Sequence, residues 1–282
     1  MKLYAVSDLH LANKANRQAL EALPPHPEDW LILAGDTGET ETHLHYALSV
    51  LTRRFNRLIW VPGNHDLWTL PLKRSSLRGE AKYRRLVSIC REYGVLTPED
   101  PYVLWPATEN QFLLVPLFTL YDYSFCPDDV KEEDAVAWAA ESGVVCTDEQ
   151  LLIPEPYDSI PEWCRQRCLY TEERLKNVSS DVTLILINHF PMHPDMVRLR
   201  RFRRFSIWCG TRFTEDWHLR FPVSVVVYGH MHNRSTKFLD GVRFEEVSFG
   251  YPRDWQESHG LEFYLRDVLP GNAEDFKTLP PE

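Results

Sequence analysis

The sequence predicts a mixed α/β fold in which two β-sheets pack together and helices cover their outer faces. Apolar, β-branched runs recur along the chain with helical patterns between them, an alternation typical of βαβ units. Late in the chain, Asp240-Gly241 separates two strand candidates, which favours a tight hairpin and therefore an antiparallel portion. A chain of 282 residues can bury a large core, so we expect a single domain over 1–282.

The individual elements follow from the period of the apolar residues. We expect strands near 2–7, 30–34, 57–61, 112–117, 182–188, 223–228, 242–248 and 261–266. We expect helices near 14–23, 41–54, 79–93 and 161–178. The proline-rich stretch 97–160 fits neither period well, and we interpret it as a cap or insertion over the site with a helix near 132–141.

Composition limits the classes of function. Hydrophobic residues make up 44% of the chain and charged residues 26%, as in ordinary globular proteins. No apolar stretch approaches the roughly 18–20 residues of a membrane span. The formal net charge of −10 disfavours non-specific binding of nucleic acid by the whole surface.

The first residues and the cysteines predict a cytoplasmic protein. Residues 2–7 read as a strand that delivers Asp8, which leaves no room for a leader peptide. The six cysteines contain no Cys-x-x-Cys pair, and we expect them to be reduced structural thiols.

Metal-competent side chains follow the ends of five predicted strands. Because the side chains of residues two apart on an extended backbone share a side, Asp8 and His10 form one pair and His230 and His232 another. The glycine before Asp36 allows a sharp exit from its strand and a close approach. The full set is Asp8, His10, Asp36, Asn64, His189, His230 and His232.

These ligand types predict a site for two transition metal ions. Imidazole and carboxylate together suit Mn, Fe, Zn or Co, and we expect Mn. A carboxylate such as Asp36 can bridge two ions, and a water between them would become hydroxide near neutral pH. Two such ions stabilise both the attacking and the leaving oxygen in the hydrolysis of a phosphate ester, so we expect a phosphoesterase, and a phosphodiesterase in particular.

The five segments together resemble the signature blocks of the calcineurin-like metallophosphoesterase superfamily. They read Asp8-x-His10, Gly35-Asp36, Gly63-Asn64-His65-Asp66, Asn188-His189 and Gly229-His230-x-His232. The resemblance implies a four-layer αββα sandwich with a dinuclear centre. It also implies that Asp8, His10, Asp36 and His232 hold one metal, while Asp36, Asn64, His189 and His230 hold the other.

His65 is the candidate catalytic residue beside these ligands. It could protonate the leaving oxygen or stabilise charge on the phosphate, or it could be a structural histidine. The protein Ser/Thr phosphatases of the superfamily continue their second block as Gly-Asp-x-Val-Asp-Arg-Gly. Here that block reads Gly35-Asp36-Thr37-Gly38-Glu39, without the aspartate and arginine, which disfavours that branch.

An arginine segment, residues 198–204, is the candidate for substrate binding. It carries five arginines, and we single out Arg200, Arg201 and Arg204 because arginine binds phosphate and carboxylate bidentately. The segment could hold an anionic substrate or an acidic partner protein. Alternatively, it could pair with the chain's own acidic run at 128–134.

A second resemblance concerns the substrate. Trp208-Cys209-Gly210-Thr211 and Gly250-Tyr251-Pro252-Arg253 look like a bacterial branch of the superfamily that includes a phosphopantetheinyl hydrolase. That resemblance implies a 4′-phosphopantetheinylated acyl carrier protein as substrate, a small acidic partner that the arginines would suit.

Two alternatives remain at this point. A nuclease or nucleotide phosphodiesterase could use the arginines and the aromatic residues Phe202, Phe205 and Trp208, although the acidic net charge speaks against it. A ligand-binding scaffold without activity would have substitutions at the ligand positions, and none is seen.

Overall fold

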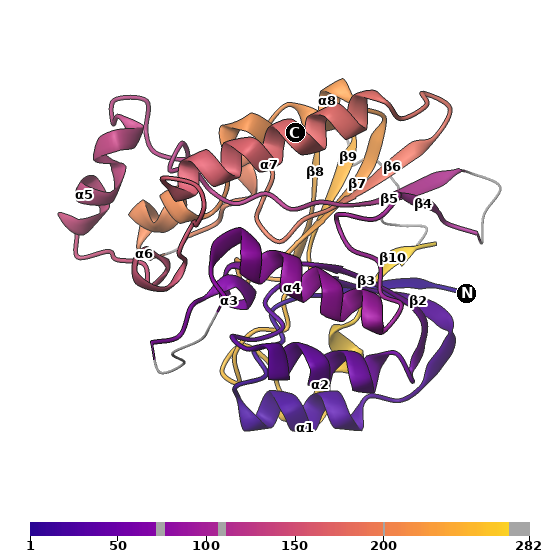
Figure 1. The fold of residues 1–282 in the computed structure, drawn as a ribbon. Coiled ribbons are helices and arrows are strands. Elements are labelled where there is room, and N and C mark those ends of the chain that lie inside the picture. Colours follow the sequence, from indigo (N-terminus) through magenta and orange to yellow (C-terminus); the bar gives the residue numbers. More distant parts are fainter. Residues whose placement is uncertain (72–76, 107–110, 200, 271–282) are drawn as a thin grey trace.

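The computed structural model of the chain describes residues 1–71, 77–106, 111–199 and 201–270. Two β-sheets pack face to face, and helices cover the outer face of each (Figure 1). The predicted mixed α/β fold with four αββα layers is confirmed.

The first sheet has four strands in the order β10-β1-β2-β3. Its three parallel strands are β1 (Leu3–Val6), β2 (His26–Ala34) and β3 (Phe55–Val61), and β10 (Arg266–Leu269) runs antiparallel to β1. Because β1, β2 and β3 are parallel, their carboxyl ends lie at one edge of the sheet.

The second sheet has six strands in the order β4-β5-β6-β7-β9-β8. Its parallel part consists of β5 (Phe112–Pro116), β6 (Thr183–Ile187), β7 (Val223–Tyr228) and β9 (Val242–Glu246). The edge strands β4 (Val103–Leu104) and β8 (Ser235–Leu239) are antiparallel to their neighbours.

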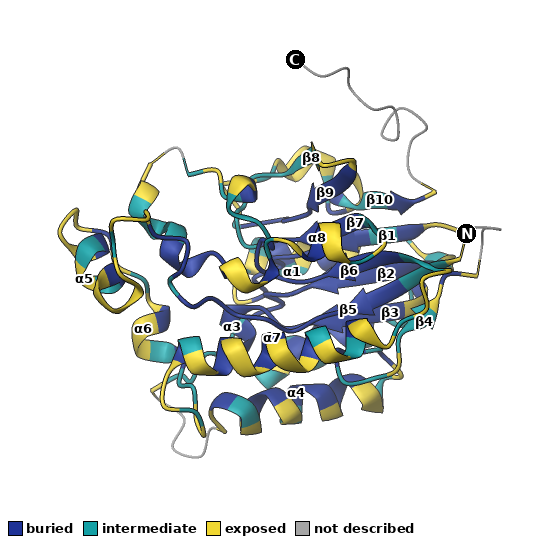
Figure 2. Cartoon of the chain, turned by 90° about the horizontal axis from the view of Figure 1, so that it is seen from above, coloured by how far each residue is buried: buried dark blue, intermediate teal, exposed yellow. Residues whose placement is uncertain are grey.

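The strands are apolar on both faces because both faces are covered. In β2, Ile32 and Ala34 belong to the core between the two sheets, while Leu31 and Leu33 pack in the core beneath the helices. All four are buried, as expected for a parallel strand inside a layered fold. Figure 2 shows the buried strands beneath partly exposed helices.

Five helices cover the sheets. The four-stranded sheet carries α1 (Lys14–Ala22), α2 (Glu41–Leu51) and α4 (Gly79–Glu92), and the six-stranded sheet carries α7 (Ile160–Lys176) and α8 (Trp217–Arg220) (Figure 1). Side-chain caps fix two of the starts: Thr40 accepts a hydrogen bond from the His43 amide, and Ser159 accepts one from the Glu162 amide, each at 3.2 Å. In the described part of the chain, no helix has the length and apolar character needed to cross a bilayer.

Most predicted elements are confirmed, and one strand prediction is wrong. The hairpin at Asp240-Gly241 joins β8 and β9, with φ of 51° and 81° at the two turn residues. Residues 261–266 were predicted as a strand, but 262–264 form a short 3₁₀ helix and the strand β10 begins only at Arg266. The apolar side chains Leu261 and Tyr264 are buried in this turn, so the run does not extend the sheet.

The stretch 97–160 is only partly outside the sandwich. Its strands β4 and β5 lie in the six-stranded sheet, whereas α5 (Ala135–Ala140) and α6 (Asp148–Leu151) lie at one end of it (Figure 1). The predicted helix near 132–141 corresponds to a 3₁₀ turn at 132–134 followed by α5. The division into one domain with a cap stays a prediction.

Candidate metal centre

The predicted metal ligands lie where the carboxyl ends of the two sheets meet. Asp8, Asp36 and Asn64 follow β1, β2 and β3, while His189 and His230 follow β6 and β7. A parallel bridge between Ser7 and Ser248 joins the two sheets at this edge. We call the seven predicted ligands the donor cluster: Asp8, His10, Asp36, Asn64, His189, His230 and His232.

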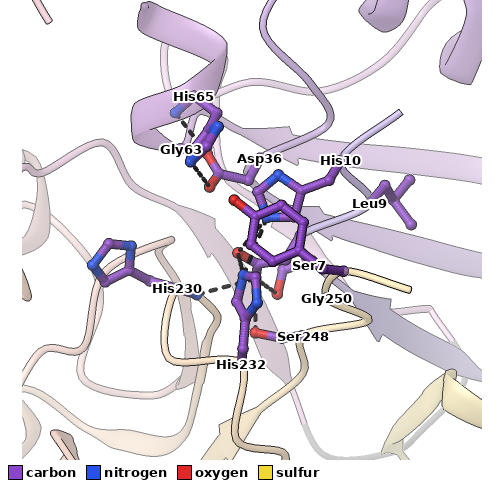
Figure 3. Close-up of polar contacts among 12 residues, drawn as sticks. Ser7, Leu9, His10, Asp36, Gly63, His65, His230, His232, Ser248 and Gly250 are labelled. Atoms are coloured by element: carbon purple, nitrogen blue, oxygen red, sulfur yellow. Dashed lines mark hydrogen bonds and ion pairs between the residues drawn. The ribbon is translucent and has the colours of Figure 1, made fainter. Parts of the chain in front are cut away.

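Three members of the donor cluster converge on one point. The Nε2 atoms of His10 and His232 lie 3.1 Å apart, and Oδ1 of Asp8 lies 3.1 Å from Nε2 of His232. Figure 3 shows His10 and His232 gathered beside Asp36. These atoms are close enough together to hold one metal ion.

A second group forms around Asp36 and His189. Nε2 of His189 lies 3.4 Å from Oδ2 of Asp36 and 3.2 Å from Oδ1 of Asn64. Nδ1 of His189 contacts the Ala34 carbonyl at 2.8 Å, which turns Nε2 toward the centre. Asp36 lies within reach of both groups, as a bridging carboxylate must.

His230 is placed differently from the other members. Its ring centroid is 5.3 Å from that of His189, but Figure 3 shows the ring pointing away from His10 and His232. Its Nε2 is buried and has no hydrogen-bond partner among the described residues. Burial and the neighbouring His189 lower its pKa to about 3, so the ring is neutral, the form that binds metals.

The backbone of the donor cluster is strained. Asp8, His10, Asp36, His230 and His232 all have φ between 42° and 69°, a region that residues other than glycine rarely adopt. Such strain persists only where surrounding contacts enforce it, and it concentrates at functional sites. Sequence alone gave no sign of this feature.

Glycines allow the closest approaches in the centre. A Cβ on Gly63 would collide with the carboxylate and the amide of Asp36, and a Cβ on Gly229 would collide with Ser7 and Asp8. Asp66 ties the same loops together, since its Oδ2 accepts from the amides of Asp36 and Gly63 at 2.9 Å each.

The charges of the centre fit divalent cations. Burial would raise the pKa of Asp8, yet His232, His189 and His10 hold that pKa well below its ordinary value. Against the effect of burial, Asp8 raises the pKa of His232 to about 10, and Asp36 raises that of His189 to about 9. Metal ions carry the positive charge that these protons provide and would displace them on binding.

His65 lies at the edge of the centre with a carboxylate on each side. Its Nε2 is 3.9 Å from Oδ2 of Asp36, and its Nδ1 is 3.6 Å from Oε1 of Glu39. Burial lowers its pKa, but Asp36 and Glu39 outweigh this and raise it. Glu39 stands three residues after Asp36, the spacing at which the Ser/Thr phosphatases carry their aspartate, so that spacing could have revealed it.

The segment after β9 contributes contacts to the centre that the sequence did not predict. Oδ2 of Asp254 lies 3.0 Å from Nδ1 of His232, which turns Nε2 of that ring toward the centre. The ring of Tyr251 stacks on His10 with centroids 4.3 Å apart. Tyr251 belongs to segment 250–253, which carries the resemblance to one branch but gives the residue no role, and Asp254 directly follows that segment.

Comparison with known proteins agrees with this geometry. The model of the calcineurin-like phosphoesterase family matches residues 1–234. The chain belongs to this family. Its enzymes are metal-dependent and use a pair of divalent ions, so the chain is a metal-dependent phosphoesterase.

One family member is similar over nearly the whole chain. The [acyl-carrier-protein] phosphodiesterase PptH of Mycobacterium tuberculosis is 44% identical over 270 residues, which cover 95% of this chain and 83% of PptH. The crystal structure of that phosphopantetheinyl hydrolase superposes with a TM-score of 0.91 at 43% identity, covering 100% of this chain and 98% of the other. The predicted resemblance to this branch is confirmed.

In this member of the family, the three arginines predicted to bind substrate have different surroundings. Arg201 is exposed and lines an apolar groove of about 430 Å³ with Val145 and Phe202. Arg204 pairs with Glu141 at 2.9 Å, outside the acidic run, and packs over Trp138. Arg200 lies outside the described residues.

A second cavity is lined in part by residues that directly follow the donor cluster in sequence. It measures about 700 Å³, and Asn233 and Arg234, which directly follow His232, form part of its wall. Arg198 and Arg203 of the arginine segment line it as well. Neither of these arginines was singled out from the sequence, although both belong to the predicted segment.

Proposed function

We propose that this chain hydrolyses the phosphodiester that joins 4′-phosphopantetheine to an acyl carrier protein. The observation that carries the proposal is the 44% identity to an acyl-carrier-protein phosphodiesterase across 95% of this chain. The donor cluster supports the reaction type, and the arginine-lined cavity, part of whose wall directly follows His232 in sequence, supports an anionic substrate.

The donor cluster would bind the two metals in two sets that share Asp36. Asp8, His10 and His232 complete one set, and their convergence within hydrogen-bonding distance supports it. Asn64, His189 and His230 complete the other set. Asn64 and His189 are in contact, whereas His230 is related to His189 only by a ring-centroid distance of 5.3 Å. We expect Mn, with Fe, Zn or Co as alternatives. Bound ions of this kind polarise a phosphoryl oxygen and lower the pKa of water.

The protein's own side chains would complete the chemistry. His65 would give a proton to the leaving serine oxygen, and Glu39 beside its Nδ1 raises the pKa of the ring and would keep it oriented. The protonated ring would also offset charge on the phosphate when it stands beside the metals.

Substrate contacts fall to the arginine segment and the cavity. We propose that Arg198, Arg201 and Arg203 face the acidic carrier protein, because all three are exposed and line the two hollows. Arg204, held by Glu141 and Trp138, instead keeps the segment in place.

We also propose a cytoplasmic location, with which the six free cysteines agree.

A screen of metals against substrates tests the proposal. Metal-free protein is reloaded with Mn, Fe, Zn or Co and given phosphopantetheinylated carrier protein, bis-p-nitrophenyl phosphate, p-nitrophenyl phosphate and single-stranded DNA, with Asp36→Ala as the inactive control. We expect release of 4′-phosphopantetheine from the carrier protein. If the enzyme cleaves the aryl diester but releases nothing from the carrier protein, the proposed substrate is refuted. Efficient cleavage of DNA would favour a nuclease.

A further inference from the structure

A buried carboxylate from outside the signature blocks reaches the donor cluster. Asp148, the first residue of the short helix α6, has no exposed surface. Its Oδ1 accepts a hydrogen bond from Nδ2 of Asn64 at 3.0 Å and another from Nε1 of Trp68 at 2.6 Å. None of the roles described above uses this residue.

The first hydrogen bond decides which way the Asn64 amide points. The indole of Trp68 can only donate, so Oδ1 of Asp148 is an acceptor, and the amino group of Asn64 must face it. The carbonyl oxygen then faces the opposite way, where it lies 3.2 Å from Nε2 of His189. Only this oxygen can bind a cation, so the orientation determines whether Asn64 is a ligand at all.

The second hydrogen bond reaches His65. The ring of Trp68 packs against the ring of His65 with centroids 3.6 Å apart. The Thr69 amide also donates to the Leu151 carbonyl at 2.7 Å, so the end of α6 is bonded to the chain just beyond Trp68. One short helix therefore contacts the loop that carries both Asn64 and His65.

We propose that Asp148 is a positioning residue, which turns the carbonyl oxygen of Asn64 toward the second metal and holds Trp68 against His65. The inference rests on the proposed function in one respect, the role of Asn64 as a ligand. It gives the outer part of the 97–160 stretch a task in the reaction, because α6 completes the centre from outside.

The hydrogen-bond pattern selects the decisive variants. Both bonds use Oδ1, while Oδ2 is buried and has no hydrogen-bond partner among the described residues. Asp148→Asn therefore keeps an acceptor of the same shape without the charge, and Asp148→Leu removes the acceptor at similar volume. Trp68→Phe removes the second bond but keeps an aromatic ring beside His65. Gln150→Ala, at an exposed position of the same helix, is the matched control.

Calorimetric titration of the metal-free full chain with Mn²⁺ provides a readout that does not depend on which ester is cleaved. We expect two bound ions in the parent protein and in Gln150→Ala. We expect Asp148→Leu to lose about 10–100-fold in affinity at one ion, as Asn64→Ala does, because partners of metal ligands typically have effects of this size. Asp148→Asn should stay within about 3-fold of the parent, and Trp68→Phe should bind both ions normally but lower kcat.

The outcomes separate the inference from the proposed function. Parent-like binding of both ions by Asp148→Leu would overturn the inference. If Asp148→Leu does not fold, as judged by circular dichroism, Asp148→Ala removes the same acceptor, and parent-like binding of both ions by that variant would overturn the inference. Normal binding of both ions by Asn64→Ala would refute the ligand assignment and the inference together. Failure to cleave carrier protein with both ions bound would refute the substrate alone.

Discussion

The donor cluster and the arginine segment serve the same proposed reaction but are built in opposite ways. Each cluster residue except Asn64 stands two residues after a strand end or two residues after another member, and Asp8, Asp36 and His189 are at most 2% exposed. Arg198, Arg201 and Arg203 are exposed and lie in a stretch whose regular structure is one short 3₁₀ helix. The candidate metal ligands are thus held at the ends of the sheets, whereas the proposed substrate contacts lie in irregular chain.

This difference predicts how the two regions respond to substitution. Removal of a buried donor leaves its buried polar partners without a hydrogen bond or an opposite charge, so single changes should have large effects. Exposed charges act mainly through solvent-screened attraction, so each should contribute about 1 kcal/mol or less.

Asp36→Ala should be the most damaging change in the chain. Asp36 lies within reach of both metal groups, so its loss should empty or weaken both sites. We expect kcat/KM for bis-p-nitrophenyl phosphate to fall by about 10³-fold or more, which corresponds to about 4 kcal/mol. Elemental analysis and steady-state kinetics measure the two effects, with the exposed Glu28→Ala as control. Two bound ions with parent-like turnover would show that Asp36 does not bridge.

His65→Asn should lower kcat by about 10²–10³-fold without loss of metal, which lies within the usual range for loss of a general acid. Glu39→Gln, which removes charge from the partner of His65 Nδ1, should cost about 10-fold by the same reasoning. An acid matters most when the leaving group is basic. The loss should therefore be greater with the serine ester of a carrier protein than with an aryl ester, and equal losses with both would argue for a structural role.

Strand ends were the part of the centre that sequence could predict. The runs before Asp8, Asp36 and His189 are apolar and short, and parallel strands bring their carboxyl ends together, so local pattern and topology sufficed. The arginine segment does not follow a strand end, so no sheet fixes the positions of its side chains. Which of its arginines face a cavity depends on contacts with residues such as Glu141, 63 positions away from Arg204.

Residues that support the donors could not be predicted for the same reason. Asp254 lies 22 positions from His232, and Asp148 lies 84 positions from Asn64, with no shared motif to connect them. Glu39 is the exception, because it follows Asp36 at a spacing that other branches of the family use for a carboxylate.

Asp254→Asn should have an intermediate effect. The carboxylate contacts Nδ1 of His232 at 3.0 Å and would strengthen this ring as a ligand, and loss of such a partner typically lowers metal affinity about 10–100-fold. Titration with Mn²⁺ should show the weakening at the ion bound by His232 and Asp8. Glu257→Gln, an exposed carboxylate nearby, should bind as the parent does. Unchanged affinity in Asp254→Asn would mean that the loop holds His232 without this contact.

The smallest effects should come from the arginine segment, where neighbouring arginines provide an internal contrast. Arg198→Ala and Arg203→Ala should each raise KM for carrier protein by up to about 5-fold, and more strongly at low salt, because the attraction is screened. Neither change should affect KM for bis-p-nitrophenyl phosphate, which has no acidic surface.

Arg204→Ala should behave differently, because this arginine already has partners within the chain. Loss of its contacts with Glu141 and Trp138 should lower the free energy of unfolding by about 1 kcal/mol, measured by denaturant titration, with little change in KM. Arg53→Ala, an exposed arginine after α2, controls for net charge. If Arg204→Ala instead raised KM for carrier protein as much as Arg203→Ala, the ion pair with Glu141 would have to open during binding. The arginine segment would then act as a whole, rather than as separate holding and binding residues.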